Sequence, residues 1–128
     1  MIYFSIIIPT YNRQNRIKEC LTSVLNQNFD NFEIIIVDDN STDKTLDICK
    51  NIKKKDKRIK ILDNKKNLGV GKTRNRGLLK AKGKYVLFID SDDKMKKKSL
   101  LSIWRETSKN EGVNFIVCDH DINIDGKL

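Results

Sequence analysis

The stretch 3-YFSIIIPTYN-12 is a short, nearly continuous apolar run that changes abruptly into a polar loop. Runs of this kind are typical of strands that are buried on both faces of a parallel sheet. Similar runs recur along the chain, so we predict strands at 3–8, 33–37, 59–62, 85–89 and 113–118.

Helical patterns separate these apolar runs. Apolar residues repeat at helical spacing from Ile17 to Leu25 and from Leu46 to Ile52, and a further helix is predicted over 70–81, with Gly83 as its terminating glycine. Residues 100–104 indicate another helix. Alternating strands and helices predict a single α/β domain over residues 1–128, a Rossmann-like three-layer α/β/α sandwich with a mostly parallel sheet.

Composition narrows the class of protein. The 128 residues suffice for one domain with a core, and no apolar run approaches the ~20 residues that cross a bilayer. The first residues lack the basic region and cleavage site of a signal peptide, which favours a cytoplasmic location. Cys20, Cys49 and Cys118 are far apart, so we expect reduced, buried thiols, and His120 is not expected to bind a metal.

The net charge of +9 comes largely from lysine-rich runs such as 53-KKKDKR-58 and 94-KMKKK-98. A solvated surface is the favoured interpretation, and contact with an anionic membrane at its inner face is the functional alternative. Neither run contains an aromatic residue for base stacking, so nucleic acid is not expected as a partner.

Polar and acidic clusters follow three of the predicted strands. These clusters are 9-PTYNR-13, 38-DDNSTD-43 and 90-DSDD-93. In open α/β sheets, ligands bind beyond the carboxyl ends of the strands, where these clusters are expected to meet. A single cluster is explained by turn formation and helix capping, which is the expected role of Asp43. Adjacent carboxylates repel each other unless a cation lies among them, so the pattern predicts Mg²⁺ or Mn²⁺ and a phosphate-bearing ligand.

Four ordered segments carry a resemblance to a known family. They are 6-IIIPTYN-12, 36-IVDDNSTDKT-45, 67-NLGVGKTRNRG-77 and 83-GKYVLFIDSDD-93. With them the chain resembles the family 2 glycosyltransferases of the GT-A fold, which transfer a sugar from a nucleoside-diphosphate donor with inversion. The third segment contains GVGKT, a near match to a phosphate-binding P-loop, but Lys66 stands where that loop requires a glycine.

The resemblance implies roles for individual residues. Tyr11 would offer a ring face to the base, Asp39 would accept a hydrogen bond from uracil, and Asp38 would support Asp39 or the ribose. Arg74 is expected either to contact the donor or to pair with a carboxylate. The implied nucleotide-sugar site comprises Pro9, Thr10, Tyr11, Asp38, Asp39, Asn67, Gly69, Arg74, Asp90 and Ser91, and the implied metal site Asp92 and Asp90.

The resemblance also implies a UDP-sugar donor and an envelope polysaccharide or lipid-linked glycan acceptor. The family's catalytic base lies well beyond the D-x-D element, so we expect this chain to end before the acceptor half and to transfer sugar slowly if at all. A non-catalytic nucleotide-binding domain of the same fold is the alternative.

Overall fold

A computed structural model of the protein describes residues 1–110 and 112. Strands and helices alternate along this part of the chain in the predicted order. The elements are β1 (Phe4–Thr10), α1 (Ile17–Leu25), β2 (Phe32–Asp38), α2 (Thr45–Lys53), β3 (Ile59–Asp63), α3 (Val70–Leu78), β4 (Tyr85–Phe88) and α4 (Ser99–Lys109). The fifth predicted strand at 113–118, Cys118 and His120 lie outside the described residues.

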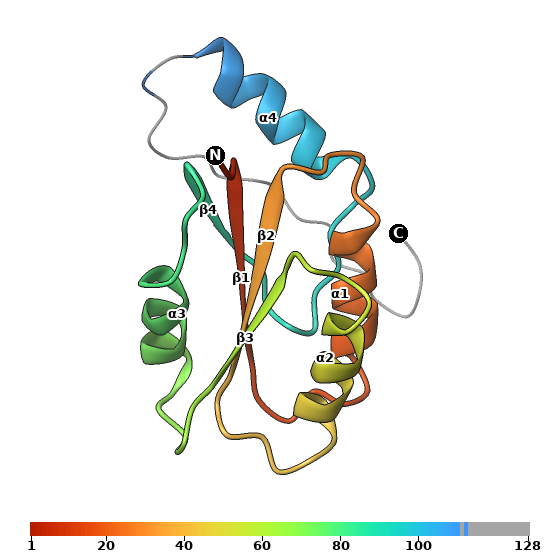
Figure 1. Ribbon diagram of the computed structural model, residues 1–128, viewed down its shortest axis with the longest axis vertical. Coiled ribbons are helices and arrows are strands. Elements are labelled where there is room, and N and C mark those ends of the chain that lie inside the picture. The colour runs from red at the N-terminus through yellow and green to blue at the C-terminus, as the bar shows by residue number, and fades with distance from the viewer. Residues whose placement is uncertain (111, 113–128) are drawn as a thin grey trace.

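The four described strands form one parallel sheet in the order β3-β2-β1-β4. Helices α1 and α2 lie on one face, α3 lies on the other, and α4 lies near the end where β1 begins (Figure 1). The predicted three-layer α/β/α arrangement is therefore confirmed. The strand order reverses between β1 and β4, and such a reversal opens a crevice at the carboxyl ends of the two strands.

The two central strands build the core because every residue of β1 and β2 is buried. Ile6 and Ile8 belong to the larger apolar cluster, which includes the buried residues of α1. Ile7 belongs to a smaller cluster on the opposite face, where α3 packs closely. A Cβ atom on Gly77 would lie 2.5 Å from Cγ2 of Ile7, so a glycine is needed for this approach.

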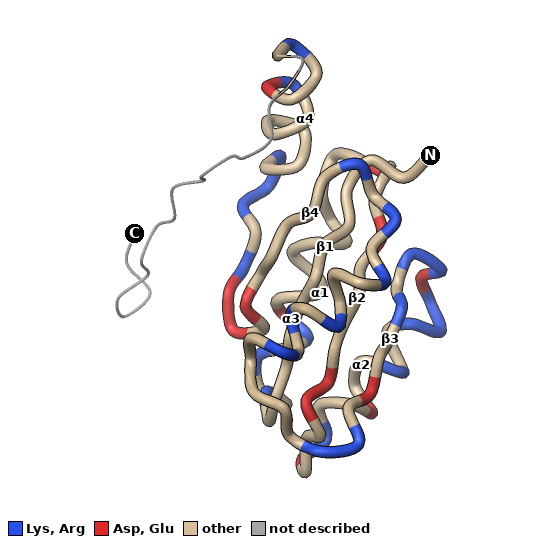
Figure 2. Tube along the Cα trace, turned by 90° about the vertical axis from the view of Figure 1, so that its left-hand side faces the viewer, with Lys and Arg blue, Asp and Glu red and all other residues tan. Residues whose placement is uncertain are grey.

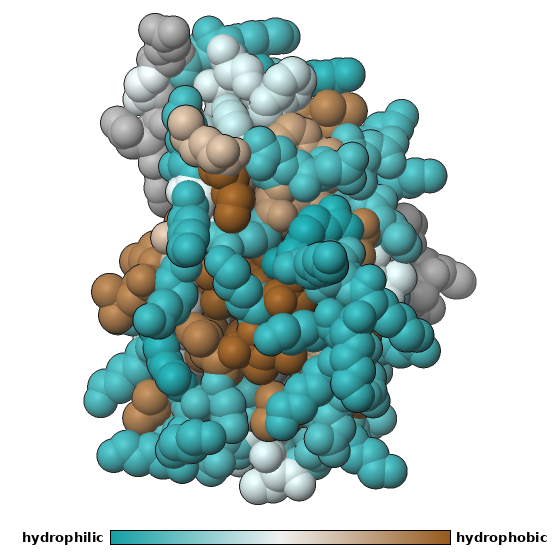
Figure 3. All heavy atoms as spheres, viewed as in Figure 1, coloured by the Kyte–Doolittle hydropathy of each residue, from teal (hydrophilic) through white to brown (hydrophobic). Residues whose placement is uncertain are grey.

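Charged residues are unevenly distributed along the chain trace. Figure 2 shows acidic positions on the segments that follow β2 and β4, with basic positions on neighbouring loops and helices. Hydrophobic residues are visible mainly in the middle of the face drawn in Figure 3 and beside α3. Hydrophilic residues cover most of the rest of this face. Among the described residues, no helix has both the length and the apolar character needed to cross a membrane.

Gly83 does not terminate α3, which ends at Leu78, and it lacks the positive φ of a helix-terminating glycine. The prediction for Gly83 was wrong because this glycine serves a different purpose. Its N–H donates to Ser5 Oγ over 2.8 Å, and a Cβ there would come within 2.5 Å of the Ser5 nitrogen. Glycine therefore lets the chain press against β1 just before β4 begins.

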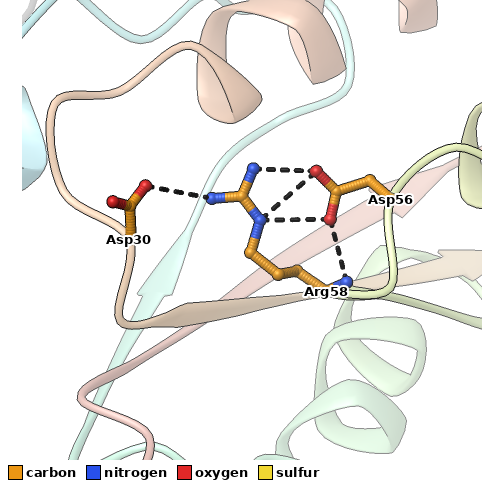
Figure 4. Close-up of polar contacts among 3 residues, drawn as sticks. All are labelled: Asp30, Asp56 and Arg58. Carbon is orange, nitrogen blue, oxygen red and sulfur yellow. Dashed lines mark hydrogen bonds and ion pairs between the residues drawn. The ribbon is translucent and has the colours of Figure 1, made fainter.

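An arginine fixes the turn between α2 and β3. Arg58 donates from its backbone N–H and from its guanidinium to Asp56, with Nη2 at 2.8 Å from Oδ2 (Figure 4). Asp30 lies 3.8 Å away on the other side, and the guanidinium lies 4.4 Å from the centre of the Phe32 ring. Hydrogen bonds from Arg58 lower the pKa of Asp56 against the opposing effect of burial. The contacts hold the beginnings of β2 and β3 together, away from the carboxyl ends of the strands.

The two described cysteines are free and buried, as predicted for Cys20 and Cys49. Burial raises the pKa of each thiol to about 12. Both thiols are therefore protonated near neutral pH, and they serve as small core residues rather than nucleophiles.

Candidate functional site: a pocket at the carboxyl ends of the strands

A pocket of about 580 Å³ opens at the carboxyl ends of β1, β2 and β4, where the strand order reverses. This volume lies within the usual range for sites that hold a small organic ligand. Ten of the lining residues come from the three segments predicted to meet there and from the loop before α3. The lining consists of Pro9, Thr10, Tyr11, Arg13, Asp39, Asn67, Gly69, Val70, Thr73, Arg74, Asp90, Ser91 and Asp92.

The end of β1 presents an aromatic ring to this pocket. Thr10 is buried, and its carbonyl accepts a hydrogen bond from the Asp39 N–H over 2.8 Å, which joins the ends of β1 and β2. Tyr11 follows with 45% of its surface exposed. Asn12 adopts a positive φ of 48°, and its side-chain oxygen accepts from the Thr42 N–H over 2.8 Å. The loop is thus held from below while the Tyr11 ring remains accessible.

Asp39 organises the loop that leads from β3 into α3. Its Oδ1 accepts from the Leu68 N–H over 2.7 Å and from Asn64 Nδ2 over 2.8 Å, and its Oδ2 accepts from the Gly69 N–H over 2.9 Å. Burial acts to raise the pKa of Asp39, but these hydrogen bonds outweigh it and leave the pKa below its ordinary value. The carboxylate is therefore ionised, and it positions the backbone where α3 begins.

Asp38 does not line the pocket, although it precedes Asp39 directly. It is fully buried, and its Oδ2 accepts from the Ser41 N–H over 2.8 Å. The Ser41 hydroxyl donates to Asp38 Oδ1 over 2.6 Å. The geometry places Asp38 beneath the site, where it closes the turn after β2.

Asp43 accepts from the Thr45 N–H over 2.9 Å, in the first turn of α2. Its other oxygen accepts from the Gln14 N–H over 3.2 Å. Asp43 therefore binds a backbone N–H of the first turn, as expected of a capping residue, although Lys44 and not Asp43 stands at the N-cap position of α2. Asp43 also joins α2 to the loop after β1.

The carboxylates after β4 each face an arginine across the pocket. Arg74 Nη2, from α3, lies 2.6 Å from Asp90 Oδ1, and Arg13 Nη2, from the loop after β1, lies 3.8 Å from Asp92 Oδ2. The Asp90 and Asp92 side chains are about half exposed, at 52% and 49%. Ser91 lies between them and is buried. Of the two roles expected for Arg74, pairing with a carboxylate is the one seen in this structure.

Three residues that line the pocket, Arg13, Val70 and Thr73, and one that supports it, Asn64, were not identified from the sequence. Arg13 follows the aromatic loop directly, and the rule that neighbouring carboxylates need a counter-charge could have pointed to it. Asn64 is buried directly after β3, and it donates to Asp39 and to Thr73 Oγ1. Its position at a strand end could have drawn attention, but its partners are distant in sequence.

The donor set suits a divalent cation that is completed by a ligand. Among residues 1–110 and 112, no group of three or more His, Cys, Asp or Glu side chains is placed to hold a metal by itself. Mg²⁺ and Mn²⁺ commonly use one or two protein carboxylates together with phosphate oxygens and water. Asp90 and Asp92 offer accessible oxygens of this kind on one wall of the pocket.

Comparisons with known proteins agree with this arrangement. The family model described as Glycosyl transferase family 2 matches residues 5–126. An uncharacterised glycosyltransferase from Haemophilus influenzae is 46% identical over 93 residues, which is 73% of this chain and 37% of that protein. A poly(ribitol-phosphate) beta-glucosyltransferase from Bacillus spizizenii is 42% identical over 110 residues, which is 84% of this chain and 17% of that protein.

Solved structures give the same result. The crystal structure of Staphylococcus aureus TarS 1-349 in complex with UDP-GlcNAc superposes with a TM-score of 0.81 at 36% identity, covering 93% of this chain and 37% of that one. This chain thus spans well under half the length of these relatives. The fold is that of GT-A glycosyltransferases, and the match extends over nearly the whole sequence. The chain therefore belongs to glycosyl transferase family 2.

Proposed function

We propose that the pocket binds a nucleoside-diphosphate sugar, and that the chain forms the donor site of an inverting, metal-assisted glycosyltransferase. One observation carries this proposal: an accessible aromatic ring, two arginines and two half-exposed carboxylates surround a single pocket. A base, a diphosphate and a cation need these three kinds of surface. TarS, which is 36% identical, has been crystallised with UDP and with UDP-GlcNAc, and this favours a UDP-sugar.

The base is proposed to lie against Tyr11, whose exposed ring offers a face for stacking. Asp39 Oδ2 accepts one protein hydrogen bond, so a lone pair is left for a ring N–H of uracil. Asn67 donates to the Asp39 carbonyl over 3.3 Å, and it holds the rim of the pocket beside Gly69. Asp38 is proposed to support this arrangement from below rather than to touch the ribose.

The diphosphate is proposed to lie between the two arginines and the two carboxylates. Asp92 would hold Mn²⁺ or Mg²⁺, and Asp90 would share in holding the metal or face the ribose. When bound, the metal would stabilise the charge that develops on the leaving nucleoside diphosphate. Arg74 would add its positive charge to the same region, since its guanidinium already lies in the pocket wall.

The acceptor is proposed to be an envelope polysaccharide or a lipid-linked glycan. The name of the Bacillus spizizenii relative, a poly(ribitol-phosphate) beta-glucosyltransferase, supports this class. No described residue is assigned as the base that takes the acceptor's proton, so we expect the 128-residue chain to bind donor but to transfer sugar slowly. A panel of acceptors with a labelled donor would measure that rate.

Peripheral contact with an anionic membrane is proposed for the segment after Asp93. Lys97 and Lys98 are exposed there, whereas Lys94 forms an ion pair with Glu19 over 2.8 Å. Co-sedimentation with phosphatidylglycerol vesicles should weaken when both exposed lysines are changed to glutamine. Unchanged sedimentation would remove this part of the proposal.

Calorimetric titration tests the donor site directly. Each of several nucleotides and nucleotide sugars is added to the chain with and without Mn²⁺. We expect UDP-sugars to bind best, with an affinity that depends on Mn²⁺, together with slow hydrolysis of the donor. Binding that is independent of metal, without hydrolysis, would instead favour a non-catalytic nucleotide-binding domain.

A further inference from the structure

The two ion pairs in the pocket differ in strength. Arg74 and Asp90 are 2.6 Å apart, a short charge-assisted hydrogen bond, and the Arg74 guanidinium also lies 6.0 Å from the centre of the Phe88 ring. Arg13 and Asp92 are 3.8 Å apart, which is too far for a hydrogen bond, and both side chains are about half exposed. Pairs of the second kind contribute little free energy and are readily exchanged. Asp92 is thus the carboxylate that can change partners.

Arg13 is held by its backbone and not by its side chain. Its N–H donates to Thr45 Oγ1 over 2.7 Å, and its carbonyl accepts from Arg16 and Ile17 at the beginning of α1. The Arg13 side chain is 46% exposed, and the residue lines the pocket. The main chain of Arg13 is therefore fixed at the rim, while the side chain is able to turn between positions inside the pocket.

A metal at Asp92 would bring a second cation to a carboxylate that already faces Arg13. Two cations within a few ångströms of one carboxylate repel each other, so a metal at Asp92 would weaken the contact with the guanidinium. In a loaded pocket, the phosphates of the donor would be anions in the same pocket that Arg13 lines. Guanidinium groups bind phosphate well because their N–H groups form a planar fork.

We propose that Arg13 competes with the metal for Asp92 in the donor-free protein and contacts the donor's phosphates once the metal has taken its place. This inference rests on the proposed function. Such a competition would couple the binding of the metal to the binding of the donor. Bare metal would displace Arg13 from Asp92 without giving it a new partner. Metal that binds together with the nucleotide would leave Arg13 a phosphate to bind. The free pocket then holds metal weakly and fills with metal and nucleotide together.

The test uses Arg13→Gln, with Arg16→Gln as the matched control. Arg16 is exposed, lies three positions along the chain and does not line the pocket, so the control removes the same charge nearby. Binding of bare Mn²⁺ is measured from loss of the free-ion signal in electron paramagnetic resonance. Binding of UDP at saturating Mn²⁺ is measured by calorimetry, and thermal melting confirms that each variant folds.

We expect Arg13→Gln to change the two affinities in opposite directions. Affinity for bare Mn²⁺ should rise about two- to fivefold, since an exposed ion pair is removed. Affinity for UDP with Mn²⁺ should fall about tenfold, since a charge-assisted hydrogen bond to phosphate is lost. The Arg16→Gln variant should stay within about twofold of the unaltered chain in both measurements, because exposed charges outside the site contribute little.

Other outcomes overturn the inference. If both affinities fall in Arg13→Gln, the arginine only positions Asp92. If Arg13→Gln and Arg16→Gln bind bare Mn²⁺ with equal affinity, Arg13 does not compete with the metal. The same conclusion follows if neither variant binds bare Mn²⁺. Arg13→Lys retains the charge without the planar fork, so bare Mn²⁺ affinity should be unchanged and UDP affinity intermediate, and a raised Mn²⁺ affinity would contradict the proposal. Failure of the unaltered chain to bind UDP would refute the proposed function, while the bare-metal measurement would still decide the competition at Asp92.

Discussion

Asp39 and Asp92 line the same pocket, but their surroundings are opposite. Asp39 is 4% exposed and accepts hydrogen bonds from two backbone N–H groups and an asparagine side chain. The Asp92 side chain is 49% exposed and faces one arginine across 3.8 Å. The first carboxylate is largely engaged by the protein and keeps one oxygen partly free for a ligand, whereas the second is open to a ligand along most of its surface.

This difference shows that an acidic residue at a strand end can serve either purpose. Carboxylates that accept backbone hydrogen bonds define the shape of the pocket, and those that face arginine side chains are the ones exposed to a ligand. Replacing the first kind should cost stability, and replacing the second kind should cost binding.

The largest effect is expected from Asp39→Asn. An amide in place of the carboxylate directs an NH₂ group at backbone N–H donors, and it leaves a buried donor without a partner. Hydrogen bonds to charged groups contribute roughly 1.5–3 kcal/mol each, so we expect the free energy of unfolding to fall by about 2–4 kcal/mol. Urea denaturation followed by circular dichroism measures this change.

Asp92→Asn is the matched control for stability. The Asp92 side chain is half exposed in a loose ion pair, so its replacement should change the free energy of unfolding by less than about 0.5 kcal/mol. Equal losses in the two variants would contradict the division between a structural and a ligand-binding carboxylate.

Asp92→Asn should have a large effect on ligand binding, in contrast to its small effect on stability. Loss of the carboxylate charge should reduce the affinity for UDP in the presence of Mn²⁺ about tenfold to hundredfold, as expected when an interaction with a charged group is lost. Affinity measured without metal should change little. Calorimetry with Mn²⁺ and then with a chelator separates the two cases, and an equal loss under both conditions would show that Asp92 does not act through a metal.

The same comparison can be made by lowering the pH. Burial acts to raise the pKa of Asp39, but hydrogen bonds from Leu68, Asn64 and Gly69 have the larger, opposite effect. The pKa therefore lies below its ordinary value of 3.8. Because the folded state favours the ionised form, the stabilisation is present above the ordinary pKa and is lost as the pH falls through the folded-state value.

The difference in unfolding free energy between the unaltered chain and Asp39→Asn should therefore shrink below about pH 4. Urea denaturation from about pH 7 down to about pH 2.5 would follow this trend. A difference that stays constant over the whole range would show that the Asp39 charge does not stabilise the fold.

The sequence was sufficient to predict the layers of the fold and the edge of the sheet at which the pocket lies. Short apolar runs such as 34–37 indicate buried strands because a strand covered on both faces of a parallel sheet has no side that faces water. Parallel strands direct their carboxyl ends the same way, so Tyr11, Asp39 and Asp92 could be expected at one rim. Their shared pocket confirms the expectation that the clusters meet.

The roles of single side chains could not be obtained in the same way. Gly83 follows a predicted helix, but its close approach to Ser5 depends on how β4 docks against β1. The partners of Asp39 come from positions 25 to 30 residues away, and those of Asp92 from a loop nearly 80 residues earlier. Side-chain contacts of such separation follow from the packed sheet and not from local spacing.

A smaller loss of stability than that of Asp39→Asn is expected from Ser41→Ala. This change tests Asp38, the one predicted nucleotide-binding residue that does not line the pocket. Ser41 Oγ donates to Asp38 Oδ1 over 2.6 Å and accepts from the Asn12 N–H over 3.0 Å. Removal of the hydroxyl should lower the free energy of unfolding by about 1 kcal/mol, the usual net contribution of hydrogen bonds of this kind.

Affinity for UDP distinguishes the two possible roles of Asp38. If Asp38 supports the turn only, the Ser41→Ala variant should bind UDP within about twofold of the unaltered chain, because the turn keeps the Ser41 N–H bond to Asp38. If Asp38 contacts the ribose, loss of the hydroxyl frees Oδ1 to move, and the affinity should change by more than that. A large change in UDP affinity would show that Asp38 takes part in ligand binding, as is proposed for Asp92, and is not only structural.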